Sequence, residues 1–172
     1  MKARPKRVAL IGLPVFQSIN NLNSVAIARH AEETGRWRFV FAAEPTVAAF
    51  RFLRTLDCDG AIVRILSDAM KREAKKIRFP IVNISSWLAE PGVPTVRHDY
   101  RAIGRQAAEH LLEKGFRRFG CVVVPGGHFV QERCSAFLET VRAKGCQPQL
   151  FHLRTTQPLN PQPLAPAECR RF

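Results

Sequence analysis

Short apolar runs alternate with amphipathic stretches along most of the chain. Residues 119–124 form a β-rich apolar run without polar alternation, which predicts a strand covered on both faces. Residues 99–113 carry apolar side chains every three or four positions, which predicts a helix. Similar patterns predict strands at 7–15, 37–43, 60–63, 80–84, 95–97 and 150–153, and helices at 18–34, 46–56, 68–77 and from Val130 to a stop at Gly145. Strands that alternate with helices predict an α/β fold with a parallel sheet and right-handed crossovers.

The helices carry recognisable start and packing signals. Asp99 stands at the N-cap of the predicted 99–113 helix, where its carboxylate can accept hydrogen bonds from free backbone amides. Gly115 supplies the stop of that helix. The inward side chains of this helix are expected to be Ile103, Ala107, Ala108, Leu111 and Leu112. Those of the 18–34 helix are expected to be Ile19, Leu22 and Ala26.

Length and composition indicate a globular chain with an irregular end. The 172 residues suit one ordinary domain, or one lobe and part of a second. The apolar content of 46% is that of a protein with a core. Residues 156–172 read TQPLNPQPLAPAECRRF, and proline blocks both helices and central strands. We therefore expect a disordered tail at 156–172, and a chain that is a fragment of a longer protein.

Several features predict a cytoplasmic, reducing compartment. No apolar run approaches the roughly 18 residues of a membrane span. Basic residues precede the apolar run 8–11, as in an export signal, but Pro14 cuts that run short. The five cysteines are odd in number and form no C-x-x-C pair, and Cys121 and Cys134 are expected to be small buried hydrophobic residues. The histidines lack metal-ligand spacing, so no metal is predicted.

The chain carries a formal net charge of +13, part of it clustered at residues 2–7 and 71–78. Basic surface attracts nucleic acid through counterion release. A solvated helix face is the simpler interpretation of the 71–78 cluster. No helix-turn-helix, zinc-finger or RNP-like pattern accompanies the charge. A basic nucleic-acid-binding module is therefore kept as an alternative function.

The signatures of common enzymes do not occur in this sequence. It contains neither a G-x-S-x-G elbow nor a Walker A loop. Residues 12–18, GLPVFQS, follow a predicted strand but lack the G-x-G-x-x-G of dinucleotide sites. We therefore predict a protein that is not an enzyme and takes no cofactor.

Polar and aromatic side chains follow the predicted strands, at the sheet edge where α/β proteins bind small ligands. Arg64 follows the third strand, and Ser86 and Trp87 follow the fourth. A guanidinium group can hold adjacent hydroxyls, and an aromatic ring can stack on a sugar. The other candidate ligand-binding residues are Phe16, Gln17, Ser18, Asn20, Asp99, Phe129 and Arg133. The structural alternatives are a helix cap for Asp99 and Ser18, a core cover for Trp87 and Phe129, and an ion pair with Glu132 or Glu139 for Arg133.

Two segments resemble a known family. Residues 99–119 read DYRAIGRQAAEHLLEKGFRRF and residues 131–137 read QERCSAF. They are similar to the Asp-Asn-x-x-x-Gly-x-x-Ala-x-x-x-Leu-x-x-x-Gly-(His/Phe) pattern and the (Glu/Ser)-Arg-x-x-Gly-Phe box of periplasmic-binding-protein-like, lac-repressor-type sugar-sensing domains. The likeness covers roughly residues 7–150 and is greatest to the form joined to an AraC-type DNA-binding domain in xylose-operon regulators. Tyr100 stands where Asn is usual, and Ser135 where Gly is usual.

The resemblance implies a three-layer α/β fold, a parallel sheet flanked by helices, in two lobes. Residues 1–115 would form the first lobe, and residues 116–155 the start of an incomplete second lobe. A xylose-like monosaccharide would bind between lobes, and Asp99 and Arg133 would contact it.

The resemblance also implies partners. The domain would sense a sugar effector for a transcriptional regulator, would bind DNA only through a region absent from this chain, and would form a homodimer. An exported sugar-binding protein is the other alternative.

Overall fold

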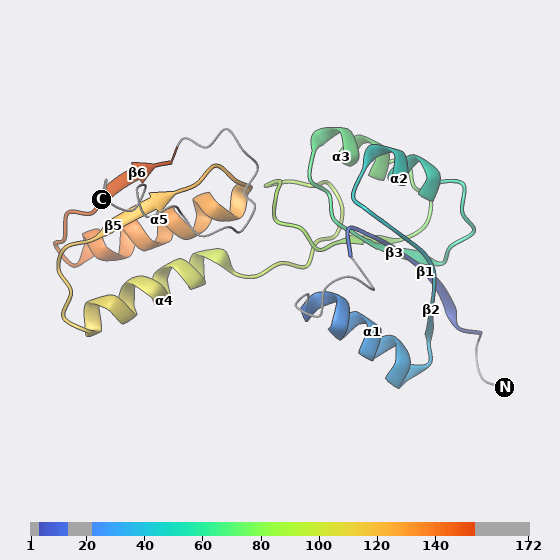
Figure 1. Cartoon of the computed structure of the whole chain (residues 1–172), viewed down its shortest axis with the longest axis horizontal. Helices are drawn as coiled ribbons and strands as arrows, with labels where there is room; N and C mark the ends of the chain where they lie inside the picture. Colours follow the sequence, from blue (N-terminus) through green and yellow to red (C-terminus); the bar gives the residue numbers. More distant parts are fainter. Residues whose placement is uncertain (1–3, 14–21, 154–172) are drawn as a thin grey trace, which may run out of the picture. The chain divides into compact units, whose positions relative to one another are not determined.

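The computed structural model of the chain describes residues 4–13 and 22–153 (Figure 1). Contacts divide it into a first unit, residues 1–99 with 127–129, and a second unit, residues 100–126 with 130–172. The first unit contains β1 (Lys6–Ile11), α1 (Leu22–Thr34), β2 (Trp37–Ala43), α2 (Val47–Leu53), β3 (Gly60–Val63), α3 (Asp68–Ala74) and β4 (Ile81–Asn83). The second contains α4 (Tyr100–Glu113), β5 (Gly120–Val123), most of α5 (His128–Ala143), whose first two residues are counted with the first unit, and β6 (Gln149–His152).

Both sheets are parallel, as the alternation of elements predicted. The first unit has four strands in the order β2-β1-β3-β4, and the second pairs β5 with β6. The strands predicted at 37–43 and 60–63 are observed with those ends. The α/β class with a parallel sheet flanked by helices is confirmed.

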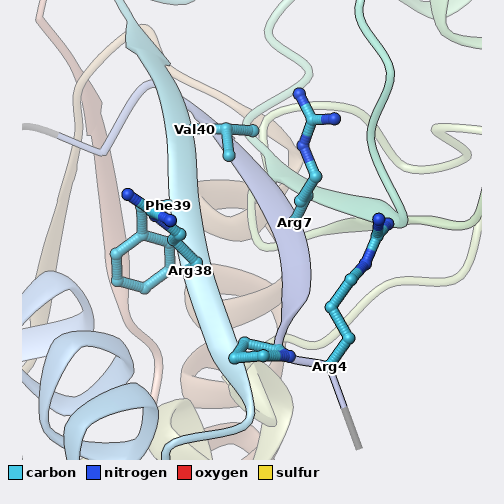
Figure 2. Close-up of a pocket in the computed structure, with 6 residues that line it drawn as sticks. Arg4, Arg7, Arg38, Phe39 and Val40 are labelled. Atoms are coloured by element: carbon cyan, nitrogen blue, oxygen red, sulfur yellow. The ribbon is translucent and has the colours of Figure 1, made fainter.

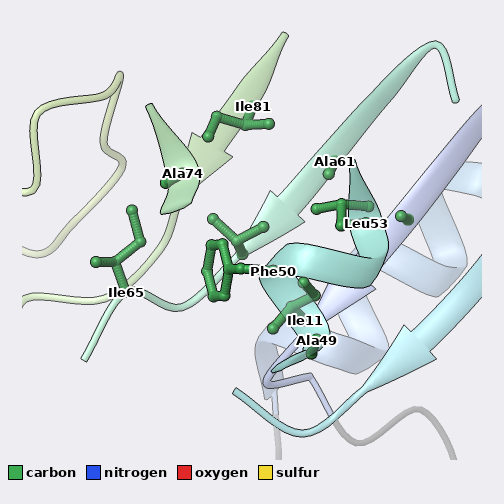
Figure 3. Packing of buried hydrophobic residues seen from close by; sticks show 10 residues of the cluster. Ile11, Ala49, Phe50, Leu53, Ala61, Ile65, Ala74 and Ile81 are labelled. Atoms are coloured by element: carbon green, nitrogen blue, oxygen red, sulfur yellow. The ribbon is translucent and has the colours of Figure 1, made fainter. Parts of the chain in front are cut away.

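Helices cover both faces of the first unit's sheet, which buries alternate residues of β1 on opposite sides (Figure 1). On one face, Phe50 and Leu53 of α2 pack with Ile11, Val63 and Ile65, all of them fully buried. Figure 3 shows the Phe50 ring near Ile11, Leu53 and Ile65. On the other face, α1 contributes Ile27 to a cluster around Val8, Leu10 and Leu13.

A β-bulge in β2 distributes its aromatic residues between the two faces. Val8 pairs with Phe39, but the next residue of β1, Ala9, pairs with Phe41, so Val40 is an extra residue in the ladder. Phe39 therefore packs in the cluster covered by α1, whereas Phe41 packs in the cluster covered by α2 and α3. Without the bulge, the period of two would place both rings on one face.

In the second unit, α4 packs against α5 through its smallest side chains. A Cβ atom at Gly104 would lie 2.2 Å from the carbonyl oxygen of Arg133, so only glycine permits this approach. Ala108, one turn on, is fully buried beside Phe119 and Val141. The prediction that Ile103 and Ala107 face inward was wrong, because both are exposed. The glycine and alanine stripe takes the packed face because it lets two backbones come close.

Three further expectations were wrong in detail. Ala26 is exposed, and Ile27 and Ala31 form the packed side of α1 instead, a phase shift of one residue. Residues 95–97 form no strand; a single bridge joins Thr95 to Asn83, the last residue of β4. The β5 strand is not covered on both faces in the described chain, since Val122 is 44% exposed and burial alternates along it.

The contact-based units are not the predicted lobes. The helix α4 falls in the second unit, because its buried face packs on α5 and Phe119. The lobes expected at residues 1–115 and 116–155 stay a prediction. The tail expected at 156–172 lies outside the described residues.

Truncation of the buried Phe50 ring tests the core of the first unit. Phe50→Ala should lower the free energy of unfolding by about 3–5 kcal/mol, because the ring is fully buried and its removal leaves a cavity. Phe52→Ala is the matched control: that ring is 52% exposed and contacts only Phe41 among the aromatic rings of the described chain, so its loss should cost about 1 kcal/mol. Denaturant unfolding measures both, and equal losses would contradict the described core.

Candidate functional site

In the first unit, the direction in which the chain connects neighbouring strands reverses between β1 and β3. From β1 the chain moves to β2 on one side and later to β3 on the other, so the connections leave the carboxyl ends of β1 and β3 in opposite directions. In open parallel sheets, such a switch point leaves a crevice where ligands bind. The residues that follow β1, β3 and β4 are therefore the candidate site.

Gly12 and Arg64 face each other at the switch point. Gly12 has a φ of 79°, and a Cβ atom there would lie 3.0 Å from Cβ and 3.2 Å from Cδ of Arg64. The Arg64 amide donates to the Ile11 carbonyl at 2.9 Å, which fixes the backbone beside the turn. The absence of a side chain at Gly12 thus makes room for the half-buried Arg64 side chain at the carboxyl edge. The sequence prediction included Arg64 but missed Gly12, whose signal was a glycine directly after the first strand.

A buried amide organises the neighbouring loops. The fully buried Asn83 ends β4, and its Oδ1 accepts from the amides of Ile65 at 3.0 Å and Ser85 at 3.1 Å. Its Nδ2 donates to the Ser85 carbonyl at 2.7 Å and to Thr95 Oγ1 at 3.3 Å. One side chain therefore joins the loops after β3 and β4 to the 93–95 segment. The prediction missed Asn83, although a polar residue at the end of an apolar strand was a usable signal.

The loop after β4 presents an aromatic pair. Trp87 is 43% exposed, and its ring centroid lies 6.2 Å from that of Phe129 at an interplanar angle of 54°. The Phe129 amide donates to the carbonyl of the buried Ser86 at 3.3 Å, and the His128 amide donates to the Trp87 carbonyl at 2.9 Å. Since Trp87 is half exposed, much of its ring surface is open to a ligand. Arg64, Ser86, Trp87 and Phe129 all lie in the first unit, three of them in the loops that follow β3 and β4.

The other predicted site residues lie elsewhere. Asp99 is an exposed residue directly before α4, the position expected of an N-cap. Arg133 lies in α5 of the second unit, with its guanidinium carbon 4.9 Å from the centre of the Tyr100 ring. Glu139, one of its expected partners, forms an ion pair with Arg101. The remaining four, Phe16, Gln17, Ser18 and Asn20, lie outside the described residues.

A basic hollow lies toward the opposite ends of the strands, beside the start of β1. It has a volume of about 560 Å³ and is lined by Arg4, Pro5, Arg7, Arg38, Phe39 and Val40. Figure 2 shows the guanidinium groups of Arg4 and Arg7 beside β1, with Val40 on β2. Two of the cations have anionic partners: Arg7 pairs with Asp57, and Arg4 lies 3.8 Å from Asp59. These ion pairs offset part of the charge that a phosphate group would meet.

Asp59 is the best-bound carboxylate of this region. Its Oδ2 accepts from the Arg7 amide at 2.7 Å, and Lys6 Nζ lies 3.4 Å from its Oδ1. The backbone hydrogen bond, followed by the lysine, lowers the pKa of Asp59 below its ordinary value. The Asp59 carboxylate therefore contributes to stability in its ionised form.

Two negative findings concern the described residues, 4–13 and 22–153. No group of three or more histidine, cysteine, aspartate or glutamate side chains in this part of the chain is arranged to hold a metal ion. None of its helices has the length and apolar character that a membrane crossing requires.

Comparison with known proteins gives a family match and several similar structures. The sequence profile of the periplasmic binding proteins and sugar binding domain of the LacI family matches residues 13–163. A periplasmic binding protein/LacI transcriptional regulator from Alkaliphilus metalliredigens, complexed with D-xylulofuranose, is 18% identical with a TM-score of 0.61, covering 86% of this chain and 56% of that one. No curated protein matches the chain with significance.

Two other solved structures are similar in the same way. The transcription regulator CcpA of Lactococcus lactis is 16% identical, with a TM-score of 0.68 over 87% of this chain and 59% of that one. The substrate-binding protein of a sugar ABC transport system from Bordetella parapertussis is 16% identical, with a TM-score of 0.64 over 87% of this chain and 52% of that one. The chain thus spans little more than half the length of these proteins. At such low identity, the likenesses show the fold alone.

Replacement of the buried amide tests the loop framework. Asn83→Ala should lower the free energy of unfolding by several kcal/mol, because it removes the acceptor of the Ile65 and Ser85 amides, and each buried donor left unpaired costs about 1–3 kcal/mol. Asn23→Ala, at an exposed position of α1, is the control and should cost less than about 0.5 kcal/mol. Denaturant unfolding compares the two, and a small loss at Asn83 would contradict the described network.

The lowered pKa of Asp59 predicts a pH dependence. A carboxylate whose folded-state pKa is depressed stabilises the fold above its unfolded-state pKa, near 3.8, and loses that contribution as pH falls through the folded-state value. The wild-type chain should therefore be more stable than Asp59→Asn near neutral pH, and the difference should shrink as pH falls below about 4. Asp57→Asn, at a carboxylate that is 84% exposed, is the control with a small effect at every pH. A difference independent of pH would contradict the assignment to Asp59.

Proposed function

The chain belongs to the family of the periplasmic binding proteins and LacI-type sugar-binding domains, and we propose that it senses a monosaccharide for a transcriptional regulator. The observation that carries the proposal is the carboxyl edge of the first unit's sheet, where Arg64 lies over Gly12 at the switch point. The half-exposed Trp87 lies in the loop that follows the next strand, β4. Such an edge offers charged donors for hydroxyls and an aromatic surface for a sugar ring.

Each candidate has a distinct chemical role in this proposal. The Arg64 guanidinium donates paired hydrogen bonds to adjacent hydroxyl oxygens, as its planar fork allows. The Trp87 indole stacks on the apolar face of the sugar ring, and Phe129 supports the indole from the side. The buried Ser86 lies beside them as a further polar group. Asp99 and Arg133 remain proposed contacts, assigned by family likeness alone.

We propose a pentose, with D-xylose as the first candidate. The resemblance of residues 99–119 and 131–137 to xylose-operon regulators supports this choice. A second support is the five-carbon sugar D-xylulofuranose in the similar Alkaliphilus metalliredigens structure. Binding would favour one of two conformations of the regulator in the cytoplasm, so that the sugar acts by population shift and no covalent chemistry takes place. Contact with DNA is assigned to an AraC-type region of the regulator other than this domain, and a homodimer is part of the proposal.

An exported sugar-binding protein is the second candidate, favoured by the similar substrate-binding protein of a sugar transport system. The two candidates share the sugar site and differ in compartment, so a secretion assay separates them. A nucleic-acid-binding module has weaker support, because Asp57 and Asp59 already pair with cations of the basic hollow.

A fluorescence titration tests the sugar site. The chain has two tryptophans, so the Trp37→Phe variant leaves Trp87 as the single reporter. Addition of D-xylose should change the emission of Trp87. Arg64→Ala in that background should weaken binding about 10- to 100-fold, the loss expected for hydrogen bonds from a charged group. Arg38→Ala, at the opposite ends of the strands, is the matched control and should leave the affinity unchanged.

Asp99→Ala separates the ligand role of Asp99 from its capping role. As a ligand, its loss should abolish detectable D-xylose binding in the complete protein while the melting temperature falls only slightly. As a cap alone, its loss should cost about 1 kcal/mol of stability and leave the affinity unchanged. Absence of any sugar response in the full-length protein, across D-xylose, L-arabinose and D-ribose, would overturn the proposed function.

A further inference from the structure

Two cysteines of the second unit face each other across neighbouring elements. Cys121 lies in β5 and Cys134 in α5, and their sulfur atoms are 2.9 Å apart. Both residues are only half-buried, so they do not fit the small buried hydrophobic role that the sequence suggested, which suits the 7% exposed Cys146 instead. The sulfur separation is longer than the about 2.04 Å of a covalent disulfide and shorter than an ordinary contact of two sulfur atoms. A small movement of the side chains would bring them into bonding range.

The segment between the two cysteines carries part of the candidate site. Residues 122–133 contain Gly126, Gly127 and Phe129, the last of which belongs to the aromatic pair with Trp87. A Cβ atom at Gly127 would lie 2.6 Å from Cα of Trp87, and the His128 and Phe129 amides bond to carbonyls of the loop after β4. The two sulfur atoms therefore stand at the two ends of the segment that supplies Phe129.

We propose that Cys121 and Cys134 form a reversible disulfide by exchange with a low-molecular-mass disulfide, and that this bond restrains the segment carrying Phe129. The bond itself is independent of the function proposed above; an effect on sugar affinity rests on that function. The other described cysteines provide a contrast, since Cys58 lies in the first unit and the Cys146 sulfur lies 4.0 Å from a backbone carbonyl.

The exchange has two steps. One of the two cysteines loses its proton and attacks one sulfur of the small disulfide, forming a mixed disulfide and releasing one small thiolate, which takes up a proton. The other cysteine then loses its proton and attacks the sulfur of the first, forming the protein disulfide and releasing the second small thiol. Two protein thiols and one small disulfide thus become one protein disulfide and two small thiols, and an excess of small thiol reverses both steps.

The closeness of the two sulfur atoms favours the second step. Burial, and after it the neighbouring Cys134, raise the pKa of Cys121 to about 12. A protonated thiol is a poor nucleophile, so the cross-link depends on the short distance between the sulfur atoms. Once a mixed disulfide has formed on one cysteine, that distance gives the other a high effective concentration for the second step.

Peptide mapping tests the bond directly. Trypsin cleaves after Arg118, Arg133 and Arg142, so Cys121 and Cys134 fall on the separate peptides 119–133 and 134–142. The full chain is equilibrated with oxidised and reduced glutathione, and free thiols are then blocked with iodoacetamide. The protein is digested with trypsin without reductant, and the peptide masses are measured by mass spectrometry. The expected result is one cross-linked pair of these peptides, lighter by two hydrogens than their sum and lost on addition of excess reduced glutathione. Alkylation of both cysteines, or separate glutathione adducts on each, would overturn the proposal.

Two further measurements address the restraint and its link to sugar binding. Oxidation should slow amide hydrogen exchange at residues 124–130 by about fivefold or more in the wild type and in the Cys58→Ser control, and should not slow it in Cys134→Ser. Unchanged exchange in a cross-linked chain would overturn the restraint. D-xylose titration of both redox states keeps the two proposals apart: a cross-link without any sugar binding contradicts the proposed function only, and sugar binding without a cross-link contradicts the disulfide only.

Discussion

The buried amide of Asn83 is the constraint on which the candidate site depends. It stands at the last residue of β4, where the regular ladder ends and the loops that could hold a ligand begin. Backbone groups leaving a sheet lose their partners, and in a buried position each unpaired group is costly. A single side chain satisfies the Ile65 and Ser85 amides and the Ser85 carbonyl, so the loops after β3 and β4 are held without a longer strand. Arg64, Ser86 and Trp87 all lie on backbone that this amide anchors directly or through a neighbour.

Acidic side chains of the first unit lie inside clusters of basic ones. Glu73, almost completely buried, lies within 3.6 Å of the cationic groups of Arg51, Arg54 and Lys76. At the start of β1, Asp57 pairs with Arg7, and Asp59 lies close to the cationic groups of Arg4 and Lys6. The formal net charge of +13 already counts these carboxylates, but their positions show that neighbouring anions reduce the local field at both surfaces. This is one reason why the sheet edge, and not the basic hollow, carries the functional proposal.

The fold was predictable from sequence where local pattern and tertiary packing agree. The β2 and β3 strands were located at their observed ends, because short apolar runs flanked by glycine or polar residues have few other conformations. The phase of α4 was not predictable: a 3.6-residue period favours the larger Ile103, whereas the choice of Gly104 as the packed residue depends on how close α5 comes. The bulge at Val40 was also hidden, since nothing in an alternating aromatic strand marks an extra residue. For the site, the rule that ligands bind at the carboxyl ends of strands led to Arg64 and Trp87 as candidates, but the supporting positions of Gly12 and Asn83 appear only in three dimensions.

The bulge in β2 has a consequence for the chain in concentrated solution. β2 is an outer strand of its sheet, and the backbone groups along its open side are a template on which another molecule could add a strand. An extra residue at Val40 breaks the even spacing of those groups and increases the local twist, so a straight strand cannot pair along the whole of β2. Arg38 adds charge beside the break. The same irregularity that divides aromatic rings between the two faces of the core thus protects an exposed edge from edge-to-edge aggregation.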